Sequence, residues 1–298
     1  MEKIKITFLG TSDSIPTKLR NHPAILLAYK NENILIDCGE GTQRQFKIAE
    51  ISPMKLTSIL ITHWHGDHTF GLPGLLQTLN MMNYNKKLKI YGPKGTRRYI
   101  NLLKELANIN LSLDVYELEN NVFVDNSEFC IETKSMDHTS PTNAYSFKIK
   151  DKRRLDKQKL KKLKLPNSPI IKSLQQGKDI VYNNRKIKAS QVSYIEKGRK
   201  VTIVLDTKLN QNAINLAKDS DILISESSFS SEDKDHAKEF KHLTATDAAV
   251  IAKKAKVKRL ILTHVSQRYE GNISIIEKEA KKMFKNTSIA KDFDSLIV

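Results

Sequence analysis

Three histidines and one aspartate lie within six residues of one another in the stretch ILITHWHGDHTFGLPGLL, Ile59–Leu76. They are His63, His65, Asp67 and His68, and they include three of the eight histidines in the chain. Imidazole nitrogens and carboxylate oxygens are good ligands for Zn²⁺ and similar divalent ions. Side chains two residues apart in an extended segment point the same way, so His63 and His65 can share one ion while Asp67 and His68 face a second. The cluster predicts a metal centre, and a solvated polar loop is a poor alternative.

Four buried-looking segments end in polar residues that could join this centre. SILIT leads into His63, VTIVL into Asp206, DILIS into Glu226 and RLILT into His264. Sites in α/β proteins collect at the carboxyl ends of strands, so four such endings indicate one shared site. Two cations about 3.5–4 Å apart need a shared oxygen ligand, which Asp206 could provide. His138, in the loop SMDHTSPTNAY, and His264 could complete the two ligand sets, although each alone could be an ordinary histidine.

The segments around these residues alternate between strand-like and helix-like patterns, which predicts an α/β chain. Strands are predicted at 4–10, 24–29, 33–39, 57–63, 88–93, 201–207, 221–227 and 259–266. Helices are predicted at 41–51, 71–82, 96–108, 212–220 and 244–256. Thr244 with Asp247 resembles a helix-start box. The positions of His22 and His236 suggest no ligand role.

The charge of the chain is concentrated in one segment. The formal net charge is +17, and residues 148–188 carry 15 Lys or Arg against three acids. The leucines in KDKRRLDKQKLKKLKLP predict a short helix before Pro166, with little apolar surface to bury. We therefore expect a protruding basic arm, inserted between two strands, and a polyanionic partner, with nucleic acid favoured over a membrane surface. A solvated charged linker and a generally lysine-rich composition are the alternatives.

Several features predict a cytoplasmic protein without a membrane span. The two cysteines, Cys38 and Cys130, cannot form a disulfide framework. A run of about 18 apolar residues is lacking. The first residues, MEKIKITFLGTS, read as a strand and lack an apolar signal region.

The motifs resemble a known family. THWHGDH is similar to the His-x-His-x-Asp-His signature of the metallo-β-lactamase superfamily. More specifically, the chain resembles ribonuclease Z, the tRNA 3′-processing endonucleases, in their short form. The segments that carry this likeness extend over nearly the whole chain: FLGTSDSIPTKLRN, LIDCGEGTQRQ, ITHWHGDHTFGLPGLL, and HLTATDAA with LILTHVSQRY.

The resemblance implies a fold, a metal centre and partners. The fold is an αβ/βα sandwich, with two mixed sheets packed face to face and helices outside. It forms a single domain over 1–298, and the basic arm at 148–188 would grip precursor tRNA. The subunits would form homodimers with two Zn²⁺ each. The implied ligands are His63, His65 and His138 for one ion, Asp67, His68 and His264 for the other, and Asp206 as the bridge.

The resemblance also implies catalytic residues and RNA contacts. Asp67 would take the proton of the attacking water, and His242, oriented by Glu226, would protonate the leaving oxygen. The implied RNA contacts are Lys18, Arg20, Arg153, Arg154, Lys161 and Lys162. Two positions depart from the family pattern: Ser225 replaces a histidine before Glu226, and Ser168-Pro169 replaces a Gly-Pro pair of the arm.

The expected activity is a zinc-dependent endoribonuclease that removes the 3′ trailer of precursor tRNA. The cut would lie just 3′ of the discriminator nucleotide and leave a 3′-hydroxyl on the tRNA and a 5′-phosphate on the trailer. One alternative is a dinuclear metallohydrolase of the same fold that acts on small phosphodiesters or sulfate esters. A second is a non-catalytic RNA-binding protein, for which the complete ligand set is unfavourable.

Overall fold

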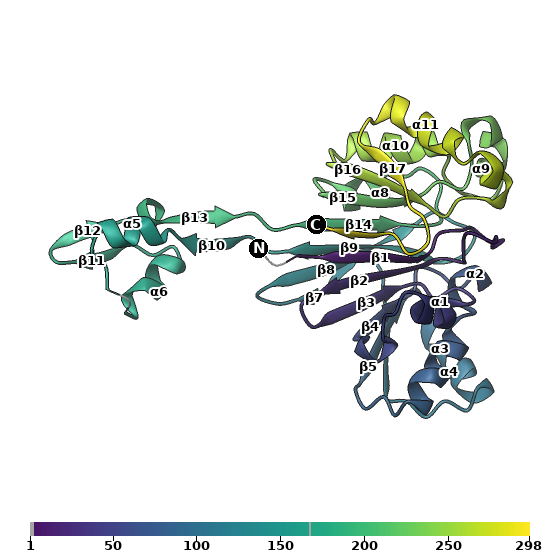
Figure 1. Ribbon diagram of the computed structural model, residues 1–298, viewed down its shortest axis with the longest axis horizontal. Helices are drawn as coiled ribbons and strands as arrows, with labels where there is room; N and C mark the ends of the chain where they lie inside the picture. Colours follow the sequence, from purple (N-terminus) through teal and green to yellow (C-terminus); the bar gives the residue numbers. More distant parts are fainter. Residues whose placement is uncertain (1–2, 167) are drawn as a thin grey trace. The chain divides into compact units, whose positions relative to one another are not determined.

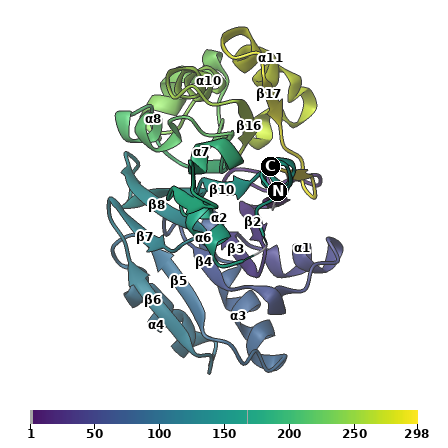
Figure 2. The ribbon, with the colours of Figure 1, turned by 90° about the vertical axis from the view of Figure 1, so that its left-hand side faces the viewer.

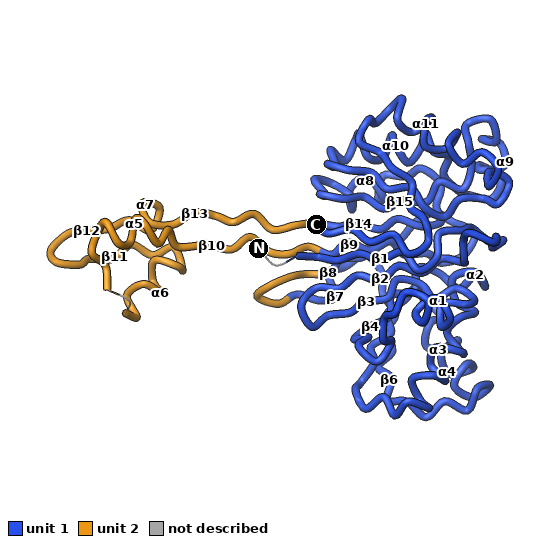
Figure 3. The backbone as a smooth tube through the Cα atoms, in the orientation of Figure 1, with its two compact units in different colours: residues 1–125, 131–147, 200–298 blue, residues 126–130, 148–199 orange. Residues whose placement is uncertain are grey.

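The computed structural model describes residues 3–166 and 168–298 of the chain. Residue contacts divide the chain into two compact units (Figure 3). The first unit consists of Met1–Asp125, Ile131–Phe147 and Lys200–Val298. The second unit consists of Asn126–Cys130 and Lys148–Arg199. The second unit thus extends beyond the 148–188 segment that the charge pattern delimits.

Two seven-stranded sheets form the centre of the first unit. The order in one sheet is β18 (Ser295–Ile297), β1 (Lys5–Gly10), β2 (Ala24–Tyr29), β3 (Glu32–Ile36), β4 (Ser58–Leu60), β5 (Leu88–Gly92) and β6 (Leu113–Glu117). The order in the other is β17 (Thr287–Ile289), β16 (Arg259–Thr263), β15 (Ile222–Glu226), β14 (Lys200–Val204), β9 (Thr142–Ile149), β8 (Phe129–Met136) and β7 (Asn121–Asp125). Strands β3 to β6 are parallel to one another, and so are β14 to β17. The strands that precede the predicted site residues therefore run in the same direction within each sheet.

Helices cover the outer face of each sheet (Figures 1 and 2). Those on the first sheet are α1 (Thr42–Ile48), α3 (Leu72–Met81) and α4 (Thr96–Leu106), with η1 (Pro53–Lys55) nearby. Those on the second are α8 (Gln211–Ala217), α10 (Ala245–Lys254) and α11 (Ser274–Met283). Short elements complete the unit: α2 (Gly66–Thr69), η2 (Ser231–Asp233), α9 (Lys234–Glu239) and η3 (Gln267–Asn272).

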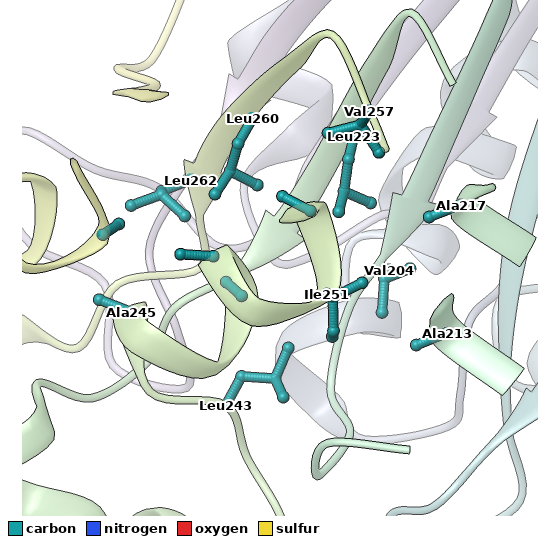
Figure 4. Close-up of a cluster of buried hydrophobic side chains, with 14 of the residues drawn as sticks. Val204, Ala213, Ala217, Leu223, Leu243, Ala245, Ile251, Val257, Leu260 and Leu262 are labelled. Atoms are coloured by element: carbon teal, nitrogen blue, oxygen red, sulfur yellow. The ribbon is translucent and has the colours of Figure 1, made fainter. Parts of the chain in front are cut away.

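Strands β14, β15 and β16 of the second sheet are mostly apolar on both faces because both faces are buried. Leu223 of β15 and Leu260 of β16 pack with alanines of α8 and α10 (Figure 4). The small alanine side chains allow these helices to lie close to the sheet. Thr244 caps α10 and forms the capping box with Asp247 that the sequence predicts.

Side chains from the two sheets meet in the layer between them. The ring of Tyr29 on β2 lies 5.5 Å from that of Phe147 on β9. Tyr145, also on β9, donates a hydrogen bond of 2.6 Å to the carbonyl oxygen of Ile61, just after β4. The unit is therefore an αβ/βα sandwich with helices outside, and this part of the predicted fold is confirmed.

The second unit has a small hydrophobic core of its own. It contains β10 (Lys152–Leu155), α5 (Lys157–Lys162), α6 (Ile170–Gln175), β11 (Ile180–Tyr182), β12 (Arg185–Ile187), α7 (Ala189–Val192) and β13 (Ser193–Glu196). β10 pairs with β13, and β11 forms a hairpin with β12. Leu155, Leu160 and Leu165 pack against buried residues such as Leu174 and Val192. These three leucines thus bury more apolar surface than their spacing in the sequence predicts.

Within the described residues, none of the helices combines the length and apolar character needed to cross a membrane.

Candidate active site

The carboxyl ends of the parallel strands bring the predicted ligands together. His63 and Asp206 follow β4 and β14, His264 follows β16, and Asp67 and His68 lie on α2. Three groups each offer ligand atoms within 4.8 Å of one another; two contain the predicted ligands, and the third is Glu226, His242 and His264. The first group is His63, His65, His138 and Asp206, and the second is Asp67, His68, Asp206 and His264. The structure thus brings together all seven residues, with Asp206 shared between the groups.

Asp206 occupies the middle of the cluster. Its Oδ2 atom lies 3.5 Å from His63 Nε2 and 3.4 Å from His68 Nε2. The same oxygen lies 3.7 Å from His138 Nε2, while Oδ1 lies 3.1 Å from His264 Nε2. A carboxylate in this position can donate one oxygen to each of two cations.

The donor atoms fit metal ions better than they fit one another. His63 Nε2 and Asp206 Oδ1 are buried and form no hydrogen bond of good geometry within the described residues, although Oδ1 lies 3.1 Å from His264 Nε2. Buried polar atoms are almost always paired, so two such atoms at one site indicate a missing partner. His68 Nε2 and His264 Nε2 also lie only 3.2 Å apart. A cation would satisfy the lone pairs of all four atoms, and this donor set suits zinc.

The charges at the site agree with this fit. Burial lowers the pKa of His63 well below its usual value and lowers that of His138, which keeps both rings neutral. Burial works against the ionised form of Asp206, but His264 and His68 outweigh it and hold the pKa of this carboxyl well below its usual value. Burial also opposes a charged His68, yet Asp206 and Asp67 raise the pKa of that ring. The carboxylates therefore attract positive charge at the position where a metal would supply it.

Asp37 is a buried partner of the cluster that the sequence reasoning missed. Its Oδ2 accepts a hydrogen bond of 2.6 Å from His68 Nδ1, which leaves His68 Nε2 free to face the cluster. Its two oxygens also accept bonds from the backbone nitrogen and the hydroxyl of Thr62, each of 2.7 Å. Such carboxylate partners fix the tautomer and orientation of a metal-binding histidine. The signal was available in LIDCG, where Asp37 ends a strand as the other site residues do.

His138 is held by a second missed partner. Its Nδ1 atom lies 3.1 Å from the carbonyl oxygen of Lys241, the residue before His242. The ammonium of Lys241 in turn donates to Asp137 at 3.0 Å and to the carbonyl of His138 at 3.2 Å. These contacts tie the His138 loop to the loop that carries His242.

Glu226 and His242 form a pair beside the metal cluster. His242 Nδ1 lies 3.0 Å from Glu226 Oε2, and the other oxygen of Glu226 accepts a bond of 2.7 Å from the backbone nitrogen of Thr207. Burial disfavours a charged His242, but Glu226 and Asp206 outweigh it and raise the pKa of this ring to about 9. Ser228 was also missed: its hydroxyl donates to Glu226 Oε2 at 2.7 Å and lies 2.9 Å from His264 Nδ1. Ser228 therefore connects the pair to the cluster.

Ser225, which departs from the family pattern, does not join this network. Its side chain is fully buried, and its hydroxyl donates to the carbonyl oxygen of Glu226 at 3.0 Å. Neighbouring residues of a strand point to opposite faces, so Glu226 keeps its direction towards His242 whatever residue precedes it.

Three site residues have left-handed backbone conformations. The φ angles of Asp37, Asp206 and His264 are 57°, 30° and 54°. Non-glycine residues occupy this region at a cost of roughly 1–3 kcal/mol each, and such strain collects at functional sites. At the end of each strand, this conformation turns the chain and directs the side chain towards the cluster.

A cavity of about 480 Å³ opens onto the cluster. Its lining includes His65, Asp67, Asp206, His242 and His264 from the two groups and the Glu226 pair. It also includes residues that the sequence reasoning did not single out: Asp13, Ser14, Ile15, Ser228, Phe229, Phe240, Ser266, Gln267 and Arg268. A substrate can therefore reach the candidate ligands and His242 from one cavity.

The candidate RNA contacts differ in their surroundings. Arg20 is buried, and its Nη1 donates to Thr11 Oγ1 and to the carbonyl of Ala290, each at 2.8 Å. Arg20 therefore holds its own loop in place, whereas Lys18 is exposed.

In the second unit, Arg153 donates to Ser193 Oγ at 2.8 Å, and Arg154 pairs with Glu196 at 2.7 Å. Lys161 and Lys162 are exposed. The two lysines are therefore better placed to meet a phosphate than the two arginines.

Comparisons with known proteins agree on the fold, and the curated relatives that match the full chain are ribonucleases Z. Residues 4–165 match the model of the family described as "Anti-Pycsar protein Apyc1". A ribonuclease Z from Archaeoglobus fulgidus is 39% identical over 300 residues, covering 99% of this chain and 97% of the relative. The crystal structure of the short form of human tRNase Z aligns with a TM-score of 0.71 at 27% identity, covering 98% of each chain. The metallo-β-lactamase fold protein YhfI from Bacillus subtilis aligns with a TM-score of 0.73 at 18% identity, covering 100% of each chain, and shows the fold alone.

Proposed function

Because this chain belongs to the ribonuclease Z family of metallo-β-lactamase-fold proteins, we propose that it removes the 3′ trailer of precursor tRNA. The cut lies just 3′ of the discriminator nucleotide and leaves a 3′-hydroxyl on the tRNA and a 5′-phosphate on the trailer. The observation that carries this proposal is the full-length likeness to ribonuclease Z, joined to a Glu226–His242 pair that borders the same cavity as the metal cluster.

The proposed cofactors are two zinc ions per subunit. His63, His65 and His138 would hold one, Asp67, His68 and His264 the other, and Asp206 would bridge them. Zinc at such a site makes a water molecule more acidic and stabilises negative charge on phosphate oxygens. The unpartnered His63 Nε2 and Asp206 Oδ1 support this assignment.

The chain's own side chains can handle the protons of the reaction. Asp67 lines the cavity, so its carboxylate can accept a proton as a water molecule attacks the phosphorus. The bond between phosphorus and the 3′-oxygen breaks, and that oxygen needs a proton. His242 donates it, and Glu226 holds the ring by its Nδ1 atom. The remaining nitrogen, Nε2, is the one that can donate to the substrate.

Cleavage of a 3′-extended tRNA transcript tests the proposed function. We expect one cut, mapped just after the discriminator nucleotide, that a chelator abolishes and added zinc restores. We expect the cut to require bound metal because seven of the proposed site residues are ligands, so a chelator removes the centre of the site. Product ends mapped to the nucleotide, with and without the chelator, provide the measurement. An intact transcript, combined with hydrolysis of bis(p-nitrophenyl) phosphate, would contradict the tRNA substrate and leave the metal centre in place.

That second outcome describes the alternative function, a hydrolase of the same fold acting on small phosphodiesters or sulfate esters. The match over residues 4–165 does not distinguish the two functions, because this range contains five of the proposed ligands but neither Glu226 nor His242. The likeness to ribonuclease Z extends over 99% of the chain, beyond the range of that match.

The second unit is proposed to bind precursor tRNA through its phosphates. A concave surface of about 770 Å³ in this unit is lined by five Lys or Arg side chains: Lys159, Lys162, Lys164, Arg185 and Lys186. Tyr182 lies among them and offers a planar ring. Lys and Arg bind phosphates and release counterions, so affinity should fall steeply with salt.

A triple variant, Lys161→Gln, Lys162→Gln and Lys164→Gln, tests this binding, because Lys162 and Lys164 line the concave surface and the neighbouring Lys161 is exposed. We expect weaker binding of precursor tRNA. The slope of log affinity against log salt concentration should fall by roughly one for each lysine that meets a phosphate. Hydrolysis of bis(p-nitrophenyl) phosphate should be unchanged. The affinity is measured by titration of labelled precursor tRNA at several salt concentrations.

The chain offers a matched control at the end of α10. Lys253, Lys254 and Lys256 are exposed, and Lys256 has a φ of 55°, close to the 50° of Lys164. Their triple replacement by glutamine removes the same charge from a helix end of the same geometry. Equal losses of affinity in both variants would assign the effect to net charge and contradict the proposed RNA-binding surface.

Two further parts of the proposal come from the family resemblance. The chain is proposed to form homodimers, and its mass in solution, measured by light scattering, tests this. A cytoplasmic location remains a prediction from the sequence.

A further inference from the structure

Four planar groups are stacked beside the catalytic cavity and have no role in the proposed chemistry. The guanidinium of Arg268 lies over the ring of Phe229 at 5.1 Å. The ring of Phe229 lies 6.4 Å from that of His236, with an angle of 27° between the planes. His236 lies 6.5 Å from Phe240, at 23°. The three rings therefore form one ladder of offset planes, and the guanidinium of Arg268 covers its Phe229 end.

One end of this ladder is held firmly. Arg268 Nη1 donates to Asp233 Oδ1 at 3.1 Å, and the hydroxyl of Tyr269 donates to the other oxygen of Asp233. Phe229 is buried beneath Arg268. The guanidinium of Arg268 and the ring of Phe229 are therefore held in place before any ligand arrives.

The other end of the ladder is an exposed aromatic ring. Phe240 is the C-cap residue of α9 and has 49% of its surface exposed, yet it lines the cavity that contains His242 and the proposed ligands. An exposed phenylalanine at the rim of a catalytic cavity offers a flat apolar face at a fixed angle. Successive bases of single-stranded RNA stack on faces of this kind.

We propose that Phe240 is a base-stacking platform for the nucleotide on the 5′ side of the scissile phosphate. This inference depends on the proposed function, and it adds a substrate-positioning residue to that site. In the proposed reaction, His242 protonates the 3′-oxygen of this nucleotide, so its ribose must lie next to His242. Phe240 lines the same cavity as His242, and the ring of Phe229 in the same ladder lies 5.9 Å from that of His242. The base attached to that ribose is therefore the one that we assign to Phe240.

The test combines Phe240→Ala with a precursor tRNA that carries an abasic ribose at the discriminator position. For the unmutated chain, we expect kcat/KM to fall about tenfold or more when the base is removed, which corresponds to the loss of one stacked base. Phe240→Ala should lose a similar factor on the intact precursor and little further on the abasic one. If the losses of kcat/KM caused by Phe240→Ala and by the missing base multiply independently, the proposal is overturned. It is also overturned if Phe240→Ala loses no activity on the intact precursor.

Two other variants separate stacking from packing. Phe240→Trp keeps a flat ring and should retain activity, whereas Phe240→Leu keeps an apolar side chain of similar size and should resemble Phe240→Ala. Full activity in Phe240→Leu would contradict base stacking on Phe240. Tyr116→Ala serves as a matched control, since Tyr116 is 41% exposed on β6 and is absent from the cavity lining.

Zinc content and mass in solution separate base stacking from an effect on the metal centre or on subunit assembly. Zinc content should be the same in all variants, and light scattering should give an unchanged mass. A change of mass in Phe240→Ala would make this ring a contact between copies of the chain and overturn the platform. If the unmutated chain does not cut the intact precursor, the proposed function itself fails, and the platform falls with it.

Discussion

Replacing Asp206 by asparagine is expected to remove bound zinc and to lower the rate of precursor cleavage by at least about 10³-fold. Asp206 is the residue shared by the two ligand groups, and its oxygens lie 3.1–3.7 Å from nitrogens of four histidines. Asparagine has the same shape but lacks the negative charge and one of the two anionic oxygens. Metal ions at such sites contribute several kcal/mol of transition-state stabilisation, and each 1.4 kcal/mol is a factor of ten. Metal content by atomic spectroscopy and single-turnover cleavage provide the two measurements.

Asparagine is preferred to alanine because of the backbone at this position. The φ of Asp206 is 30°, and asparagine tolerates the left-handed region better than other residues with a Cβ atom. The variant therefore tests the charge without adding backbone strain. Asp221→Asn is the control. It makes the same change just before β15, at the end of this strand that is away from the site, where Asp221 pairs with Lys258 at 2.7 Å. Full zinc content together with normal cleavage in Asp206→Asn would contradict the bridging role.

The sequence predicted the strand ends of the site because that information is local. An apolar run followed by a polar residue is visible in SILIT-His63 or RLILT-His264 without knowledge of the fold. Strands that are buried on both faces and run parallel must end at one edge of their sheet, so the shared location of these residues follows from architecture. The structure places the two sheets so that both edges meet at Asp206.

The residues that the sequence reasoning missed are those whose roles depend on contacts distant in the chain. Asp37 contacts His68 from 31 positions away, and Lys241 contacts His138 from 103 positions away. The sequence does not reveal how many partners a serine will have: the hydroxyl of Ser228 contacts Glu226, His242 and two atoms of His264. Arg20 shows the opposite case: it has the chemistry of an RNA contact, but the fold buries its guanidinium against Thr11 and Ala290.

The second unit shows a different limit. Its elements are short, from three to six residues, so their periodicity is weak. The hairpin of β11 and β12 did carry a signal, since Asn183 and Asn184 both have positive φ, which asparagine tolerates in two-residue turns. The burial of the leucines was not recognised because of the many lysines in the segment. A helix with so many lysines has the sequence pattern of a helix exposed to solvent on all sides.

Replacing His242 by alanine is expected to lower the turnover of precursor tRNA by about 10² to 10⁴-fold, the usual contribution of a general acid. His242 belongs to neither proposed ligand set, so zinc content should stay intact. Its ring is held by Glu226 at 3.0 Å and lines the cavity that contains the proposed ligands. Turnover and metal content are measured on the same preparation, and parallel losses of both would assign His242 to the metal centre instead.

The leaving group provides the decisive control for this role. The 3′-oxygen of a nucleotide leaves as a strongly basic alkoxide unless it is protonated, whereas p-nitrophenolate is a stable anion that needs no proton. His242→Ala should therefore impair precursor cleavage far more than hydrolysis of bis(p-nitrophenyl) phosphate. Glu226→Gln should show the same selectivity to a smaller degree, because glutamine can still accept a bond from His242 Nδ1 but no longer stabilises its positive charge. A loss of equal size on both substrates would mean that His242 acts before the bond breaks, in binding or in positioning, rather than as the proton donor.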